Sequence, residues 1–201
     1  PIIMSNNAAM FPHIDIGTDT PIETKIGAFE FRSIWGLMRE SDYFDSNPDN
    51  DLRYFQGGGV FLQPSFLPGF SFGVSRIHYR DLQDQDFGVK DVFISFADFS
   101  SNTDTLANGN VVNDVYDQMT SANFKWTFEE IGFEAYFELA RNDFSNIRSI
   151  LTEPEHSRAY TIGFAKMIDI GKGRAFKGVY EHTNLGRPRL RNLRPATLIY
   201  Y

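Results

Sequence analysis

The chain has no cysteine, which excludes disulfide frameworks, thiolate metal sites and cysteine nucleophiles. It has no run of about 18 apolar residues, the length that a membrane-spanning helix needs. Acidic residues outnumber basic ones by 26 to 19, which gives a net charge of −7. The most basic stretch, Arg187–Arg194, is short. Too few cations therefore gather in one place to follow a phosphate backbone, and a nucleic-acid partner is not expected.

Aromatic residues and glycine are abundant instead. The 201 residues include twenty Phe, nine Tyr, two Trp and sixteen Gly, and 42% of the chain is hydrophobic. Rings favour strands, and glycine favours tight turns. The length suits one substantial domain. The composition therefore predicts a single β-rich domain over residues 1–201.

Strict alternation of apolar and polar residues predicts long strands. Ala122–Phe128 places rings and alanine at even positions and polar residues at odd ones, and Phe133–Leu139 repeats the pattern after a tight turn. Two alternating segments with so short a link predict a hairpin. Further alternating segments are Phe29–Leu37, Pro68–Arg80, Tyr160–Ile168 and Arg174–Asn184. In Pro68–Arg80 the apolar face changes after Val74, which either a bulge or emergence from an apolar layer would explain.

The lengths of strands and loops point towards a transmembrane β-barrel. The segments run to about 10 to 13 residues, whereas globular strands usually have about five or six and tilted bilayer-crossing strands are longer. Short turns are expected at Thr20–Thr24, Pro64–Leu67, Glu129–Ile131 and Asp169–Gly173, and long loops at Arg39–Leu52, Asp81–Val115 and Arg141–Ser157. This alternation is typical of outer-membrane barrels. A soluble sandwich or barrel whose rings face a core is the alternative that periodicity leaves open.

The alternation holds only if Val89–Phe99 is not a spanning strand. Its apolar residues recur at helical spacing, so an amphipathic helix is expected within the external excursion. The count is then eight strands and the beginning of a ninth at Ala196. An open sheet would leave unpaired edges in lipid, so the remaining strands are expected outside this sequence.

Charged residues lie opposite the apolar positions of several predicted strands. In a barrel they would line the interior, either as a mutually paired plug or as contacts to a solute. Their mixed signs argue against a simple ion-selective pore and suit hydrogen bonding to a hydroxyl-rich ligand. The residues are Glu30, Arg32, Glu134, Glu138, Lys166 and Lys177.

Local clusters give little support for catalysis or metal binding. In Glu153–Tyr160 the two glutamates beside His156 resemble an acid/base pair, but a brace within a long loop explains the same residues. Asp42–Asp51 has calcium-like spacing without the glycine and glutamate of an EF-hand, so only a looser calcium site stays open. Gly57-Gly58-Gly59 lacks the Lys-Ser/Thr of a P-loop and marks a bend or a close approach. No catalytic residue, metal ligand or cofactor is predicted.

Four segments resemble the Wzi family of capsule-assembly outer-membrane proteins, especially its Bacteroidetes-type members. They are, in chain order, WGLMRESDYFD (Trp35–Asp45), PSFLPGFSFGVSRIHYRDL (Pro64–Leu82), GFEAYFELARNDF (Gly132–Phe144) and EPEHSRAYTIGFAK (Glu153–Lys166). The last is the most specific. Family members are longer and continue on both sides of this span, so the resemblance implies an internal fragment.

The resemblance implies an all-β fold, an antiparallel barrel of about 18 strands with long extracellular loops and short periplasmic turns. Its N-terminal helical plug and remaining strands would lie outside this sequence. The implied protein is a non-catalytic, lectin-like factor in the bacterial outer membrane, in contact with lipid and lipopolysaccharide, that attaches or organises capsular or surface polysaccharide. The oligomeric state, including membership of a larger outer-membrane complex, stays open.

Residues of the long loops are the candidate polysaccharide contacts. Two rings would stack on sugars and the other side chains would supply hydrogen bonds; the candidates are Trp35, Arg39, Glu40, Tyr43, Glu155, His156 and Arg158. The first alternative function is an oligosaccharide porin or transporter, and the second is a glycan hydrolase that uses Glu153 or Glu155.

Overall fold

The computed structural model describes residues 11–40, 51–82, 92–97, 103–105, 111–113, 117–142 and 158–186. Within them the chain is all-β, with nine strands in one antiparallel sheet and a separate two-stranded sheet. The two-stranded sheet pairs β6 (Thr103–Thr105) with β7 (Val111–Asn113). Helix among the described residues is limited to α2 (Ile94–Ala97) and the 3-10 turn η2 (Glu129–Ile131). None of the described helices has the length and apolarity to cross a membrane.

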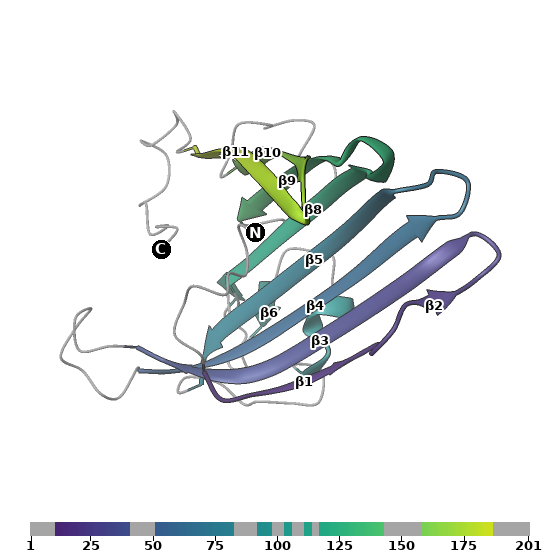
Figure 1. Cartoon of the computed structure of the whole chain (residues 1–201). Helices are drawn as coiled ribbons and strands as arrows, with labels where there is room; N and C mark the ends of the chain where they lie inside the picture. The colour runs from purple at the N-terminus through teal and green to yellow at the C-terminus, as the bar shows by residue number, and fades with distance from the viewer. Residues whose placement is uncertain are drawn as a thin grey trace.

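The main sheet follows the chain, because each long strand pairs with the next one. Its order is β1-β3-β4-β5-β8-β9-β10-β11, with β2 also paired to β3, and Figure 1 shows β3, β4, β5 and β8 side by side. This confirms the predicted antiparallel strands, while the strand expected from Ala196 lies outside the described residues. The bounds are β1 (His13–Gly17), β2 (Ile22–Glu23), β3 (Gly27–Arg39), β4 (Leu52–Pro64), β5 (Phe70–Asp81), β8 (Asp117–Phe128), β9 (Phe133–Asn142), β10 (Arg158–Gly171) and β11 (Arg174–Leu185).

Short turns and long connections alternate as predicted, with one turn displaced. The turns after β4, β8 and β10 lie where they were expected. The first turn does not, because Ile22 still pairs with Phe29 and the chain reverses at Thr24–Gly27 instead of Thr20–Thr24. There the Thr24 amide donates to the Gly27 carbonyl at 3.0 Å. The φ of Gly27 is 146°, a conformation open to glycine, and this fixes the turn beyond the predicted site.

The excursion between β5 and β8 contains one turn of the predicted helix and a small hairpin. Of the predicted Val89–Phe99 helix the structure describes residues 92–97, which include α2. The hairpin of β6 and β7 was not predicted, because strands of three residues are too short to show periodicity.

One face of the main sheet is apolar and largely uncovered. Directly opposed residues of antiparallel strands point to the same face, so the register defines rows that cross the sheet. Within this face Phe72 stacks on Phe124 at 5.7 Å, and Phe124 and Trp126 are each 38% exposed. The row at its centre consists of Phe29, Leu62, Phe72, Phe124, Phe137 and Ile162.

Towards the long connections the same face becomes polar. On β5, Arg76, His78 and Arg80 follow Phe70, Phe72 and Val74 at the same parity. The pairing of β5 with β4 and β8 is continuous through these residues, so a bulge, one of the two explanations considered for the change of face, is wrong. All three polar residues are buried.

Helix α2 and the residues just before it cover this polar end. Trp35 Nε1 donates to the Val92 carbonyl at 2.5 Å, and Ser95 N donates to Gln56 Oε1 at 2.8 Å. The Ser95 hydroxyl lies 2.7 Å from His78 Nδ1. Residues 92–97 therefore lie over the polar end of this face and shield it from the surroundings.

The Gly57-Gly58-Gly59 run of β4 lies beneath this cover. A Cβ added to Gly58 would be 2.3 Å from Phe96 Cζ, so only glycine lets the ring approach the strand. This confirms the close approach predicted for the triple glycine.

Candidate ligand-binding groove

The other face of the main sheet is polar and lines a groove of about 790 Å³. That volume falls within the range of small-molecule sites, about 300–1,000 Å³. The lining comes from every long strand between β3 and β11, and contains hydroxyl, amide, carboxylate and amine groups. Of the aromatic residues on this face, Phe61 and Tyr136 line the groove.

Two adjacent rows define the floor of the groove. The first consists of Glu30, Phe61, Gly73, Asn123, Glu138 and Thr161. The second consists of Ser71, Lys125, Tyr136, Gly163 and Glu181. Both rows combine acceptors with donors. Such a surface can hydrogen-bond many hydroxyl groups of one ligand.

The predicted interior charges lie on this polar face with one exception. Glu30, Arg32, Glu134, Glu138 and Lys177 line the groove.

Lys166 was wrongly placed among these interior charges. It is opposite Phe133 and Gly178, on the apolar face, and its amine donates to the Ile131 carbonyl in the turn. It has the same parity as Phe164 in β10, and its long side chain carries the charge back to the polar turn.

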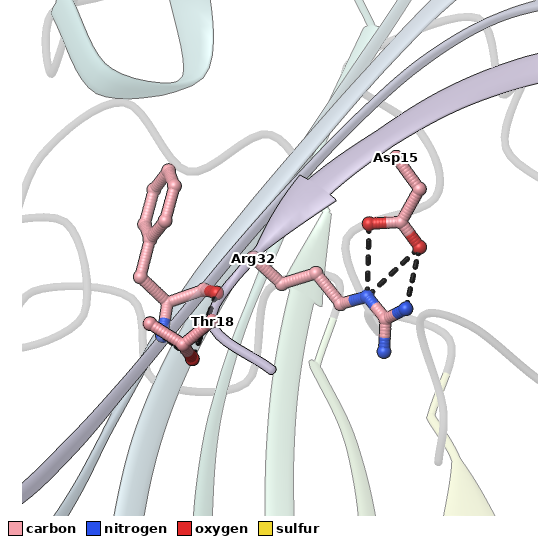
Figure 2. Close-up of polar contacts among 4 residues, drawn as sticks. Asp15, Thr18 and Arg32 are labelled. Carbon is pink, nitrogen blue, oxygen red and sulfur yellow. Dashed lines mark hydrogen bonds and ion pairs between the residues drawn. The ribbon is translucent and has the colours of Figure 1, made fainter. Parts of the chain in front are cut away.

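Ion pairs tie neighbouring strands together on the polar face. Figure 2 shows Arg32 of β3 facing Asp15 of β1, with Arg32 Nε 2.9 and 2.8 Å from the two carboxylate oxygens. Across β8 and β9, Lys125 Nζ lies 3.8 Å from Glu134 Oε2. These pairs are partly exposed, so each stabilises the sheet by no more than about 1 kcal/mol.

Thr18 continues the β1 edge where regular pairing stops. Its amide donates to the Phe31 carbonyl at 3.0 Å, and the Phe31 amide donates back to Thr18 Oγ1 at 3.2 Å. Figure 2 shows this exchange beside the Arg32 pair. The side chain thus replaces a strand partner and keeps the β3 backbone satisfied.

Each of the two groove rings rests on a glycine of a neighbouring strand. A Cβ added to Gly163 would be 2.0 Å from Tyr136 Cζ, and one added to Gly73 would be 2.1 Å from Phe61 Cδ1. Tyr136 is also fixed at its far end, because its hydroxyl donates to Glu181 Oε2 at 2.6 Å. The missing side chains of Gly73 and Gly163 therefore make room for two oriented rings.

The predicted sugar-stacking ring Trp35 is engaged within the protein. Besides its hydrogen bond to Val92, its ring meets Phe93 edge-on, with centroids 6.4 Å apart. It lies on the apolar face, away from the groove. Through these contacts Trp35 supports Val92 and Phe93, which directly precede α2.

Two of the described loop-end candidates, Arg39 and Glu40, form braces. Glu40 pairs with Arg53 at 2.5 Å, and Arg39 Nε lies 3.5 Å from Asp51, so both join the ends of β3 and β4. Arg158 begins β10 opposite Arg141, and its side chain is exposed.

The remaining site predictions lie outside the described residues. They are Tyr43, Glu155 and His156 among the glycan candidates, Glu153, and the calcium-like Asp45, Asn47 and Asp49. In the part of the chain that the structure describes, no group of three or more acidic or histidine side chains could hold a metal ion.

Sequence reasoning missed the two groove rings. Alternation predicted that Tyr136 lies on the polar face beside Glu134 and Glu138, but it did not indicate what the ring does there. Phe61 stands between Val60 and Leu62, so its face could not be read from periodicity. The partners Gly73 and Gly163 become visible only when the register is known.

Comparison with protein-family models, with curated proteins and with solved structures finds no match.

Proposed function

We propose that this chain is part of an outer-membrane β-barrel that binds and organises or attaches capsular or other surface polysaccharide without catalysing a reaction. The observation that carries the proposal is the two-faced sheet. One face exposes a continuous row of large apolar side chains, and the other lines a groove that contains hydroxyl, amide, carboxylate and amine groups. Lipid suits the first face and a hydrated, hydroxyl-rich ligand suits the second.

Strand length supports the membrane part of the proposal. The long strands β3, β4, β5, β8, β10 and β11 have 12 to 14 residues. Crossing the hydrocarbon core at a tilt takes about 9–11 residues. The extra residues at each strand end would extend the sheet beyond the hydrocarbon core into the polar regions on either side. The buried polar end beneath α2 would lie in one of these regions.

The resemblance to the Wzi family supports the polysaccharide part. Each of the four similar segments contains or adjoins the end of a strand that meets a long connection, namely the ends of β3, β5 and β9 and the start of β10. Long connections face the cell exterior in outer-membrane barrels. Similarity that includes all these ends fits a shared task at the cell surface.

The polysaccharide role is tested in the complete chain, by which we mean the longer barrel protein of which this sequence is proposed to be a part. The test is to delete Ile150–Ser157. We expect the variant to insert, as shown by its outer-membrane fraction and its heat-dependent electrophoretic mobility, and to lose most surface-retained polysaccharide, measured by glycan staining of intact cells. The matched control replaces the same eight residues with a glycine-serine segment of equal length. If both inserted variants keep normal polysaccharide, the role of this loop is refuted.

The groove supports a second candidate, an oligosaccharide porin or transporter. Its lining combines apolar side chains with hydroxyl, amide and charged groups of both signs, and such a mixture suits the passage of neutral solutes. Single-channel recording of the complete chain separates the two functions. A conductance that maltohexaose reduces would favour the porin, and its absence would favour the binding protein.

A further inference from the structure

The two groove rings are positioned as a pair. Tyr136 lies over Gly163 and Phe61 lies over Gly73, and both residues line the groove. Because one side of each ring meets a glycine backbone, the other side is available to the groove. The hydrogen bond from Tyr136 to Glu181 fixes the orientation of one ring before any ligand arrives.

The spacing of the rings calls for an extended ligand. Phe61 is on β4 and Tyr136 on β9, three strands away in the sheet. At about 4.8 Å per strand the separation along the sheet is roughly 14 Å. Small or polar residues occupy the space between them, namely Gly73, Ser71, Asn123 and Lys125. A molecule that touches both rings must be a chain of several units.

The charges narrow the chemical class of that chain. Carboxylates outnumber cations in the groove lining, with Glu30, Glu134, Glu138 and Glu181 against Arg32, Lys125 and Lys177. A polyanionic ligand would meet repulsion from this excess. A neutral oligosaccharide would not, and its ring faces can pack on aromatic rings while its hydroxyls bond to amides, amines and carboxylates.

We infer that Phe61 and Tyr136 are the sugar-stacking residues of the groove, and that an uncharged glycan chain lies across β4 to β9 with Asn123 and Lys125 bonding its hydroxyls. The inference rests on the proposed function and adds a binding site that the loop candidates do not include. Because the contacts with glycine hold both rings in place before a ligand arrives, little conformational entropy is lost when the ligand binds.

Calorimetric titration of the complete chain in detergent, with maltoheptaose and cellohexaose as neutral probes, tests the site. We expect Phe61→Leu and Tyr136→Leu each to weaken binding about tenfold, the loss of roughly one ring contact. The matched control is Phe164→Leu, the same exchange on the apolar face of β10, which should leave affinity unchanged because Phe164 does not line the groove. Heat-dependent mobility checks that each variant is folded.

Ring-retaining variants keep the test decisive if a leucine variant does not fold. Phe61→Tyr and Tyr136→Phe should stay within about threefold of the wild-type affinity, because the stacking surface is kept. If the wild type binds a probe and the leucine variants bind it equally well, this inference is overturned while the proposed function stands. If the wild type binds neither probe nor oligosaccharides released from the cell's own capsule, the proposed function itself is refuted.

Discussion

The two faces of the main sheet share one backbone but differ in what their side chains need. On the apolar face the large rings contact one another along rows, and those at the centre, such as Phe72, Phe124 and Phe137, are partly exposed. On the polar face the side chains bond across strands, as Tyr136 does with Glu181 and Lys125 with Glu134. The rings of the apolar face therefore depend on the surrounding medium for cover, whereas the side chains of the polar face make many of their hydrogen bonds within the protein.

A charge on the apolar face should break this contrast most strongly. Phe124→Arg places a guanidinium in the centre of the exposed apolar row. In the proposed barrel this row would face lipid, so we expect the substitution to destabilise the protein in vesicles by about 2–4 kcal/mol. Asn123→Arg, one residue away on the polar face, is the matched control and should change stability by less than about 1 kcal/mol. Urea unfolding in lipid vesicles measures both. Equal effects would contradict the assignment of the two faces.

Crowding the polar face should have the next largest effect. In Gly163→Val the new side chain meets Tyr136, and overpacking of this kind costs about 1–3 kcal/mol. Adding Tyr136→Ala should recover part of that loss, because the clash is removed. The double-mutant cycle, measured by urea unfolding, would show no coupling if the ring did not lie over the glycine.

The covered polar end allows a sharper comparison within the apolar face. Ser95→Ala removes a hydroxyl that lies 2.7 Å from His78 Nδ1 and 3.3 Å from the Gln56 carbonyl. Losing these buried bonds should cost about 1–3 kcal/mol and loosen the cover over Trp35. Acrylamide quenching of Trp35, in a Trp126→Phe background, should increase. Unchanged quenching would mean that Ser95 does not hold α2 in place.

The smallest effect is expected at the exposed edge. Asp15→Asn removes the charge that faces Arg32, and an exposed pair is worth less than about 1 kcal/mol. The loss should shrink further at high salt, because salt screens the pair. Comparing urea midpoints at low and high salt measures it. A large effect that salt does not alter would show that the pair is more than a surface contact.

Alternation along single strands predicted much of the fold, because side-chain direction in a strand depends only on parity. It identified the long strands except β4, which followed only from the loop predicted before it and the turn predicted after it, and the long connections lie where they were expected. Its errors have local causes. Glycine at position 27 moved the first turn, and the reach of the Lys166 side chain let a charge occupy the apolar face.

The groove was harder to predict because it depends on pairing between strands. Tyr136 meets Gly163 only through the register of β9 with β10, which are joined by a long connection. No pattern within one strand contains that information. The fate of Trp35 shows the same limit, since its partner Val92 is 57 positions away.

The triple glycine of β4 has a mechanical consequence. Gly57, Gly58 and Gly59 line the groove on one side of the sheet, while Phe96 presses on Gly58 from the other. Gly58 contributes no side chain between Phe96 and the sheet, and the side chains of Phe55, Phe61, Ser75 and Ile77 lie beside Gly57 and Gly59. Any side chain at position 58 would displace the Phe96 ring, so the seating of the segment that contains α2 depends on this glycine.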